Sequence, residues 1–217
     1  MAEGEILKEL SDGVEKGDEE AVKTISQAAI EKGIDPVSIL EQGLTRGLLN
    51  VGERWRNGDA FITEVMLAST ALNEGLKIIE PEIQKKGGKY ERKGKIIIGT
   101  VQGDIHSIGK MIVAIMLEAA GFEVYDLGVD VPAKKFIDEV RKIKSQILCL
   151  SALLTTTMLE QKNVIDLLRM EGIRDAVKVM VGGAPVTKEW ADEIGADAYG
   201  ENAIEAVDKA IEIVEKK

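Results

Sequence analysis

The residues best suited to chemistry lie in one short loop, Gln102 to Lys110, which contains His106, the only histidine of the 217-residue chain. Asp104 precedes His106 by two residues, so its carboxylate can accept a hydrogen bond from one ring nitrogen and raise the basicity of the other. An ordinary surface histidine would fit the same sequence. One histidine and one aspartate cannot enclose a zinc ion, which needs three or four protein ligands. A metal bound here would therefore take most of its ligands from a cofactor.

Two further segments have the composition of ligand-binding loops. Ser151, Thr155 and Thr157 belong to a hydroxyl-rich stretch that follows an apolar run, although a helix N-cap would need only one such hydroxyl. Gly182 and Gly183 follow another apolar run, and such a pair lets a ligand approach the backbone, although glycine pairs are also common in ordinary turns. The motif G-x-G-x-x-G does not follow the first predicted strand, and G-x-x-x-x-G-K-[ST] does not occur. The sequence therefore disfavours a nucleotide-hydrolysing or dinucleotide-dependent enzyme.

Composition and charge exclude several classes of protein. The chain has 38 Asp and Glu against 28 Lys and Arg, a net charge of −10 that opposes binding to nucleic acid or to an anionic membrane. The N-terminus lacks the pattern of a secretory signal and no apolar run approaches the length of a membrane span, so we expect a cytoplasmic protein. Cys149, the single cysteine, lies in an apolar run, where a buried and inert thiol is expected.

The N-terminal part of the chain, residues 1–88, has a helical pattern throughout. Apolar residues recur at intervals of three and four, which predicts an amphipathic four-helix bundle. A polar, glycine-containing linker from Lys85 to Gly94 is expected to end this domain. The helices are expected over residues Glu3–Lys16, Asp18–Lys32, Pro36–Arg56 and Thr63–Gln84.

Residues 89–217 alternate between short apolar segments and helical segments. Because the expected strands are apolar throughout, the class is α/β, with a doubly wound, Rossmann-like sheet of five parallel strands covered on both faces. Ligands bind such sheets beyond the carboxyl ends of the strands, where the three motifs above are expected. The strands are expected within residues 95–101, 123–128, 145–153, 177–183 and 196–200, and helices begin near Gly109, Pro132, Met158 and Thr187, with one more at the C-terminus.

Three motifs together resemble the cobalamin-binding signature of corrinoid methyltransferase proteins. They are D-x-H-x-x-G at Asp104–Gly109, S-x-L at Ser151–Leu153 and the Gly182-Gly183 pair. The preceding segment VGERWRNGDAFITEV, residues 51–65, is similar to the helical cap of methionine synthase and of small corrinoid proteins, which cobalamin-dependent mutases lack. The resemblance covers nearly the whole chain.

The resemblance implies roles for individual residues. His106 would be the lower axial ligand of cobalt, in place of the cofactor's own base, while Asp104 and Thr157 would continue a hydrogen-bonded relay behind it. Trp55, Ile62 and Val65 would cover the upper face of cobalt, although the family often has a smaller aromatic at Trp55, which also suits a core position between helices. Further contacts with the cofactor would come from Gln102, Gly103, Ser107, Ile108, Gly109, Ser151, Leu153, Thr155, Gly182, Gly183, Tyr199 and Gly200.

The function implied by the resemblance is that of a methyl carrier. Cobalamin, as methylcobalamin in the loaded state, would take a methyl group from a substrate-specific methyltransferase. It would pass that group to a second methyltransferase with a tetrahydrofolate or coenzyme M type acceptor, and a reductive activase would rescue oxidised cofactor. Such a carrier needs neither nucleic acid nor membrane, and its cap would have to move about the linker.

Two alternatives remain at this point. A cobalamin-dependent sensor would resemble the same two domains but would need a DNA-binding module, for which there is neither length nor a basic patch. A flavodoxin-like signalling domain without cobalamin would explain the sheet, but it leaves the helical cap and the Gly182-Gly183 pair unexplained.

Overall fold

A computed structural model describes residues 2–85 and 92–215. The chain divides into two compact units, residues 1–91 and 92–217, and each is described by itself. Most of the expected linker Lys85–Gly94, and the expected boundary after residue 88, lie outside the described residues. Within the described residues, no helix has the length and apolar character that a bilayer crossing requires.

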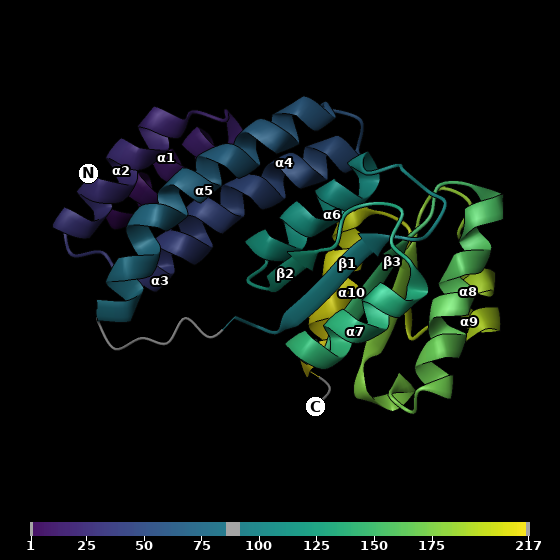
Figure 1. Cartoon of the computed structure of the whole chain (residues 1–217). Coiled ribbons are helices and arrows are strands. Elements are labelled where there is room, and N and C mark those ends of the chain that lie inside the picture. Colours follow the sequence, from purple (N-terminus) through teal and green to yellow (C-terminus); the bar gives the residue numbers. More distant parts are fainter. Residues whose placement is uncertain (1, 86–91, 216–217) are drawn as a thin grey trace. The chain divides into compact units, whose positions relative to one another are not determined.

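Helices account for the regular structure of the N-terminal unit (Figure 1), as its apolar periodicity predicted. Asp18 caps α2 by accepting a hydrogen bond from the Ala21 amide at 3.0 Å, and Asp35 with Pro36 begins the third helical run, as expected from their types. The elements are α1 (Glu3–Glu15), α2 (Glu19–Glu31), α3 (Pro36–Ser38), η1 (Ile39–Thr45), α4 (Arg46–Arg56) and α5 (Ile62–Lys85).

The third helical run differs from the prediction of one regular α-helix. Its middle segment, η1, is a π-helix, which widens the turn before α4 continues the run. Glycines allow this run to approach α1 closely: a Cβ at Gly43 would lie 2.6 Å from Cδ2 of Leu10, and one at Gly47 would lie 2.5 Å from the Ser11 carbonyl oxygen. The close packing fixes the run against α1 despite its irregular turn.

The C-terminal unit is the predicted five-stranded parallel sheet with helices, so the expected fold class is confirmed. The strand order is β2-β1-β3-β4-β5, and all neighbouring pairs are parallel. The elements are β1 (Lys95–Thr100), α6 (Ile108–Ala119), β2 (Glu123–Asp126), α7 (Ala133–Ile143), β3 (Ile147–Ser151), α8 (Thr155–Met170), η2 (Arg174–Ala176), β4 (Lys178–Gly182), α9 (Lys188–Ile194), β5 (Ala198–Gly200) and α10 (Ala203–Glu215).

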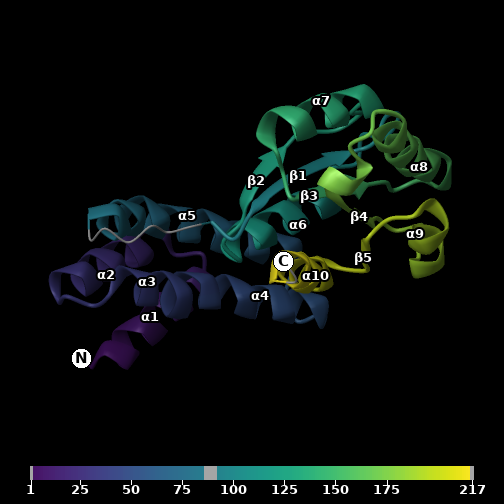
Figure 2. The same cartoon turned by 90° about the horizontal axis from the view of Figure 1, so that it is seen from below.

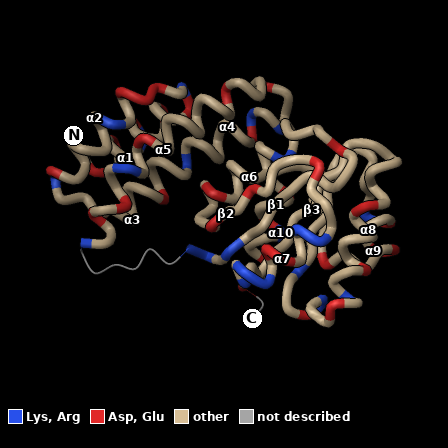
Figure 3. Tube along the Cα trace, viewed as in Figure 1, with Lys and Arg blue, Asp and Glu red and all other residues tan. Residues whose placement is uncertain are grey.

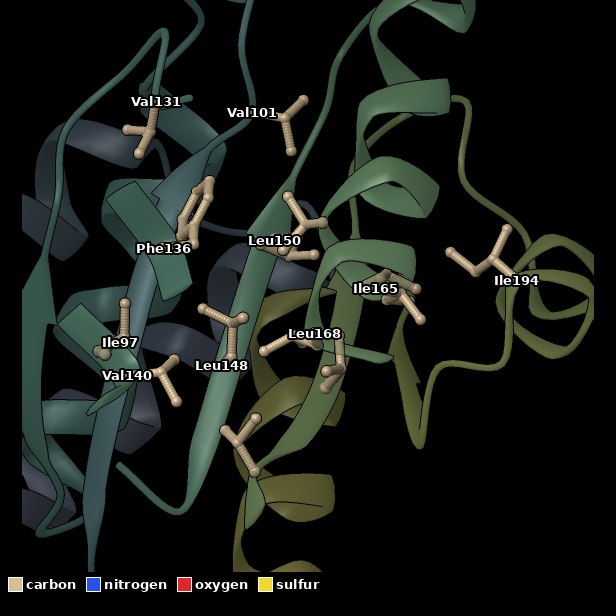
Figure 4. Close-up of a cluster of buried hydrophobic side chains, with 14 of the residues drawn as sticks. Ile97, Val101, Val131, Phe136, Val140, Leu148, Leu150, Ile165, Leu168 and Ile194 are labelled. Carbon is tan, nitrogen blue, oxygen red and sulfur yellow. The ribbon is translucent and has the colours of Figure 1, made fainter. Parts of the chain in front are cut away.

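The helices cover both faces of the sheet (Figure 2), with α7, α8 and α9 on one face and α6 and α10 on the other. Alternate strand residues such as Ile97, Leu148 and Leu150 point to the first face, where Phe136 and Ile165 pack against them (Figure 4). Each such large side chain contributes about 1.5–3 kcal/mol by leaving water. This core makes the sheet a rigid base for the loops at its edges.

Acidic and basic residues occur on the helices of both units (Figure 3). Many of them pair along one helix, as Lys134 does with Asp138 at 2.8 Å in α7. Exposed pairs of this kind contribute at most about 1 kcal/mol each.

One helix of this unit begins earlier than expected. The sequence placed the start of α8 near Met158, whereas the helix begins at Thr155. The hydroxyl of Thr157 accepts a hydrogen bond from the Leu154 amide at 3.3 Å, which satisfies an N-terminal donor of the helix. The hydroxyl-rich stretch therefore forms the first turn of α8, but the N-cap is Leu154, so none of these hydroxyl residues is the N-cap that the simpler explanation required.

Candidate functional site

The predicted motifs meet at the carboxyl edge of the sheet. Thr100 pairs with Ser151, Ser151 with Gly182, and Gly182 with Gly200, so the last residues of four strands form one row. The chain runs from β1 through α6 to β2 on one side of β1, and later to β3 on its other side. This reversal is the point where doubly wound sheets bind ligands, and the loop that bears His106 begins there.

The loop after β1 brings the Asp104 carboxylate against the His106 ring. Oδ1 of Asp104 lies 2.7 Å from Nδ1 of His106 and also accepts a hydrogen bond from the His106 amide at 3.0 Å. The buried hydroxyl of Thr100 donates to the His106 carbonyl oxygen at 2.8 Å. Since an ionised carboxylate only accepts, the ring donates from Nδ1 and its lone pair is at Nε2.

Asp104 accepts two further hydrogen bonds on its other oxygen. Oδ2 receives the Thr157 hydroxyl at 2.7 Å and the Leu153 amide at 2.7 Å, and the residue is only 1% exposed. Burial alone would raise the pKa of Asp104, but the hydrogen bonds from Thr157, Leu153 and His106 outweigh it and hold that pKa well below its usual range. The carboxylate is therefore ionised at neutral pH behind the imidazole.

His106 joins this buried carboxylate to the surface. Its side chain is 48% exposed, whereas that of Asp104 has no exposed area. The ring thus has one nitrogen fixed from within the protein and one that a ligand can reach. An imidazole held in this way is a good ligand for a metal ion whose other positions are already filled.

The loops and helix ends at this edge of the sheet also carry exposed apolar side chains. Large apolar residues usually leave water, so a group of exposed ones at one edge of the sheet marks a binding surface. A Cβ at Gly109, in the first turn of α6, would have no atom of the described residues within 4 Å, so there is room for a ligand beside the helix. The exposed apolar residues of the loops and helix ends at this edge are Ile105, Ile108, Val129, Leu153 and Leu154.

The glycines predicted to line the site have different surroundings. A Cβ at Gly183, where φ is +126°, would lie 1.8 Å from the Ala152 carbonyl oxygen, so the chain itself requires glycine there. At Gly182 the same atom would lie 3.0 Å from the Gly200 oxygen, a tight but lesser constraint. A role of these residues toward a ligand remains a prediction.

The other predicted residues of the C-terminal unit lie on the same edge. Gln102 and Gly103 form the turn after β1, and Ser107 precedes α6. Thr155 is exposed at the start of α8. Tyr199 lies in β5, half-buried, where burial and the nearby carboxylates Glu201 and Glu205 raise its pKa.

The predicted cap residues belong to the N-terminal unit. Trp55 is half-buried at the end of α4, Ile62 is half-buried at the start of α5, and Val65 is fully buried in α5. Their position over the cofactor remains a prediction.

Sequence reasoning missed a buried amide beside the site. Gln161 is fully buried, and its Nε2 donates to the carbonyl oxygens of Leu150 at 3.0 Å and Gly182 at 3.1 Å. Its Oε1 accepts from the indole N–H of Trp190 at 3.1 Å. A glutamine at an otherwise apolar helix position was the available signal. The Leu153 amide was also missed as a donor to Asp104, because a backbone contact leaves no mark in the residue type.

Comparison with known proteins is consistent with this geometry. Residues 94–208 match the family model described as "B12 binding domain", and residues 6–80 match a second model of the same description. The chain is 48% identical over 205 residues to trimethylamine corrinoid protein 1 of Methanosarcina acetivorans, which covers 94% of this chain and 95% of that protein. It is 45% identical over 215 residues to the dimethylamine corrinoid protein of Methanosarcina barkeri, covering 99% and 100%.

A solved structure shows the same fold. It is the methanol:cobalamin methyltransferase complex MtaBC from Methanosarcina barkeri, one chain of which is 33% identical with a TM-score of 0.84, covering 98% of this chain and 81% of that chain. The expected fold class and the expected cobalamin cofactor are thereby confirmed at the level of the family. The chain belongs to the family of B12-binding corrinoid proteins.

Proposed function

We propose that this protein is a methyl carrier that binds cobalamin with the cofactor's own base displaced and His106 as its lower axial ligand. The observation that carries the proposal is the half-exposed imidazole whose Nδ1 lies 2.7 Å from the buried, ionised Asp104. Cobalamin supplies a cobalt ion, held by a corrin ring, that accepts and releases a methyl group. The corrin already fills the equatorial positions, so a single protein nitrogen suffices.

The residues of the loop edge fit a corrin ring. Its broad apolar rim would contact the exposed side chains of Ile105, Ile108 and Leu153, which water otherwise surrounds. Gly109 leaves space beside α6 for the part of the cofactor that must pass the helix. The His106 ring lies among these residues with Nε2 available.

The relay behind His106 adjusts how strongly Nε2 donates. Asp104 keeps the Nδ1 proton on the ring, so Nε2 retains its lone pair, and the negative charge at 2.7 Å increases the electron density of the ring. The Thr157 hydroxyl, 2.7 Å from Oδ2, stabilises that charge. Partial transfer of the Nδ1 proton toward Asp104 would strengthen Nε2 as a donor, whereas an additional proton taken up by the relay would weaken it, so the protonation of the relay can favour either the loaded or the unloaded carrier.

The expected partners are methyltransferases. Two relatives are named as trimethylamine and dimethylamine corrinoid proteins, and the structural relative belongs to a methanol:cobalamin methyltransferase complex. By this likeness, a substrate-specific methyltransferase loads the carrier, with a methylamine as donor. A second methyltransferase unloads it to a tetrahydrofolate or coenzyme M type acceptor, and a reductive activase restores oxidised cofactor. Trp55, Ile62 and Val65 would shield the upper face of cobalt between these encounters.

Electron paramagnetic resonance of the Co(II) state tests the axial ligand. The apoprotein is reconstituted with hydroxocobalamin and reduced, and spectra are compared for natural-abundance and nitrogen-15-labelled protein. We expect the triplet splitting from the axial nitrogen to become a doublet on labelling the protein alone, and this effect of labelling to disappear in His106→Ala. Labelling the cofactor alone is the control and should leave the splitting unchanged.

Two results would contradict the proposal. If labelling the cofactor changes the splitting while labelling the protein does not, the cofactor has kept its own base and the role of His106 is wrong. If no cobalt remains after desalting, the proposed cobalamin carrier itself fails.

A further inference from the structure

The loop that bears His106 is hydrogen-bonded to the loop between β2 and α7. The Gly103 amide donates to Oδ1 of Asp130 at 2.7 Å, and the Asp130 amide donates to the Asp104 carbonyl oxygen at 2.9 Å. The two bonds run in opposite directions across the gap between the loops. We call this pair of bonds the Asp130 clasp. It fixes the peptide units on both sides of the Gly103–Asp104 bond.

The strands on either side bring the two loops together. The Val131 amide donates to the Thr100 carbonyl oxygen at 3.0 Å, and Val101 forms a parallel bridge with Val131. Asp130 therefore stands immediately beside the point where β1 ends and the His106 loop begins. From this position its short side chain is close enough to accept the hydrogen bond from the Gly103 amide.

The backbone of Asp130 is strained in a way that the clasp explains. Its φ is +51°, and among the described residues the other non-glycine residue with positive φ is Lys144, at +56°. Left-handed backbone is unfavourable for an ordinary residue, and aspartate tolerates it better than most. In this conformation both the amide and the carboxylate of Asp130 are directed at the neighbouring loop.

We propose that Asp130 is a positioning residue, whose clasp sets Asp104 and His106 in their ligand-binding geometry before the cofactor arrives. The role toward the cofactor rests on the proposed function. The backbone of Asp104 is held by Asp130 on one side, while its carboxylate is held by Thr157 and Leu153 on the other. With both fixed, His106 needs little reordering when it binds a metal, which lowers the entropic cost of binding.

The chain offers a matched set of variants. Asp130→Gly removes the acceptor and suits a positive φ, whereas Asp130→Asn suits the same φ and retains an acceptor oxygen. Lys144→Gly makes the equivalent change to glycine at the same φ, at the end of α7 and away from the clasp. A loss seen in Asp130→Gly alone therefore comes from the missing acceptor.

The first measurement uses the apoprotein, so it does not depend on the proposed function. Amide hydrogen exchange of Gly103 is followed by nuclear magnetic resonance. We expect exchange to become roughly five- to tenfold faster in Asp130→Gly, as for the loss of one hydrogen bond, and to stay within about twofold of wild type in Asp130→Asn and Lys144→Gly. Unchanged exchange in Asp130→Gly would overturn the clasp, whatever the cofactor does.

The second measurement uses the reconstituted protein. We expect Asp130→Gly to bind hydroxocobalamin about fivefold more weakly and to show a smaller share of the protein-derived nitrogen splitting in the Co(II) spectrum, with Asp130→Asn restoring both. If Asp130→Gly lowers only the thermal midpoint and leaves affinity and splitting as in wild type, Asp130 is structural and the inference is wrong. The inference is also wrong if Asp130→Asn loses as much hydroxocobalamin affinity and protein-derived splitting as Asp130→Gly. A wild-type spectrum without protein nitrogen would instead contradict the proposed function.

Discussion

Two carboxylates at opposite ends of the same sheet show what distinguishes the site. Asp104 follows β1 at the carboxyl edge, and Asp197 precedes β5 at the amino edge. Asp197 accepts from Arg174 at 2.6 Å, Lys178 at 3.0 Å and the Val179 amide at 2.8 Å. Burial would raise its pKa, but these donors outweigh burial and lower it. The pKa is lowered in both residues, and each carboxylate accepts several hydrogen bonds, four at Asp104 and three at Asp197.

Their donors differ in charge. Asp197 is neutralised by two cations, whereas Asp104 is held by neutral amides, a hydroxyl and an imidazole. The charge of Asp104 therefore remains available to the ring beside it, and that ring is half-exposed. A lowered pKa alone does not identify a functional carboxylate. The nature of its donors, and whether one of them reaches the surface, separates the two cases.

The presence of a cavity does not identify the functional carboxylate either. The amino edge has a cavity of about 560 Å³ lined by Lys144, Lys178, Asp197 and Lys209, among others. Two of its lysines have carboxylates close by: Lys178 pairs with Asp197, and Lys209 lies 3.2 Å from Glu212. The carboxyl edge is instead marked by exposed apolar side chains around one imidazole.

The strongest contrast should come from removing each carboxylate from the apoprotein. Asp104→Ala leaves the buried Thr157 hydroxyl and three other donors without an acceptor and should lower the free energy of unfolding by about 3 kcal/mol. Asp197→Ala should cost about 1 kcal/mol, because Lys178 is exposed to water and Arg174 keeps two carbonyl partners. The measurement is urea unfolding followed by Trp190 fluorescence in a Trp55→Phe background, which restricts the signal to the C-terminal unit. Equal losses would break the comparison.

A smaller effect is expected from the hydroxyl behind Asp104. Thr157→Val removes the donor to Oδ2 at little change in volume and should lower the free energy of unfolding by about 1.5 kcal/mol. The matched control is Thr155→Val, two residues earlier in the same helical turn, where the side chain is exposed. Because an exposed hydroxyl exchanges its bonds with water, this control should stay within about 0.5 kcal/mol of wild type. A control that falls as far as Thr157→Val would point to the cost of valine in the first turn of the helix, and not to the lost bond with Asp104, as the cause.

The smallest effect is a dependence on pH. The pKa of Asp104 is lowered in the folded protein, so its stabilisation is present above the unfolded pKa of about 3.9 and is lost as pH falls toward the folded pKa. The difference in free energy of unfolding between wild type and Asp104→Asn should therefore shrink by about 1 kcal/mol between pH 7 and pH 3. Urea unfolding at several pH values measures it, and a difference that grows on acidification would contradict the assignment.

The sequence predicted the elements well and the contacts less completely. Five apolar runs and the helical periodicity were enough for the sheet and the bundle, because burial decides those patterns. The π-helical segment η1 was missed, since a widened turn keeps nearly the same apolar spacing. His106 and Asp104 were identified from two residues and their spacing. Asp130 was not identified, because its contact with Gly103 joins residues 27 positions apart. The contact also depends on a positive φ angle, which the residue type alone does not predict.

Burial also followed from residue type at Cys149. The thiol was expected to be inert in its apolar run, and it lies buried in β3, where burial raises its pKa. At Thr157 the prediction was incomplete. The resemblance implied its bond with Asp104, but not its second bond, in which the hydroxyl accepts from the Leu154 amide. The Thr157 side chain thus bonds both the backbone at the start of α8 and the carboxylate of Asp104.

The order of the strands also bears on solubility at high concentration. The edges of the sheet are β2, with four residues, and β5, with three, while the longer strands lie between them. An edge strand exposes unpaired backbone groups to which a strand of another copy can add, and the number of such groups falls with its length. The short edges thus limit edge-to-edge aggregation, and in β2 the charged residues Glu123 and Asp126 add to this protection.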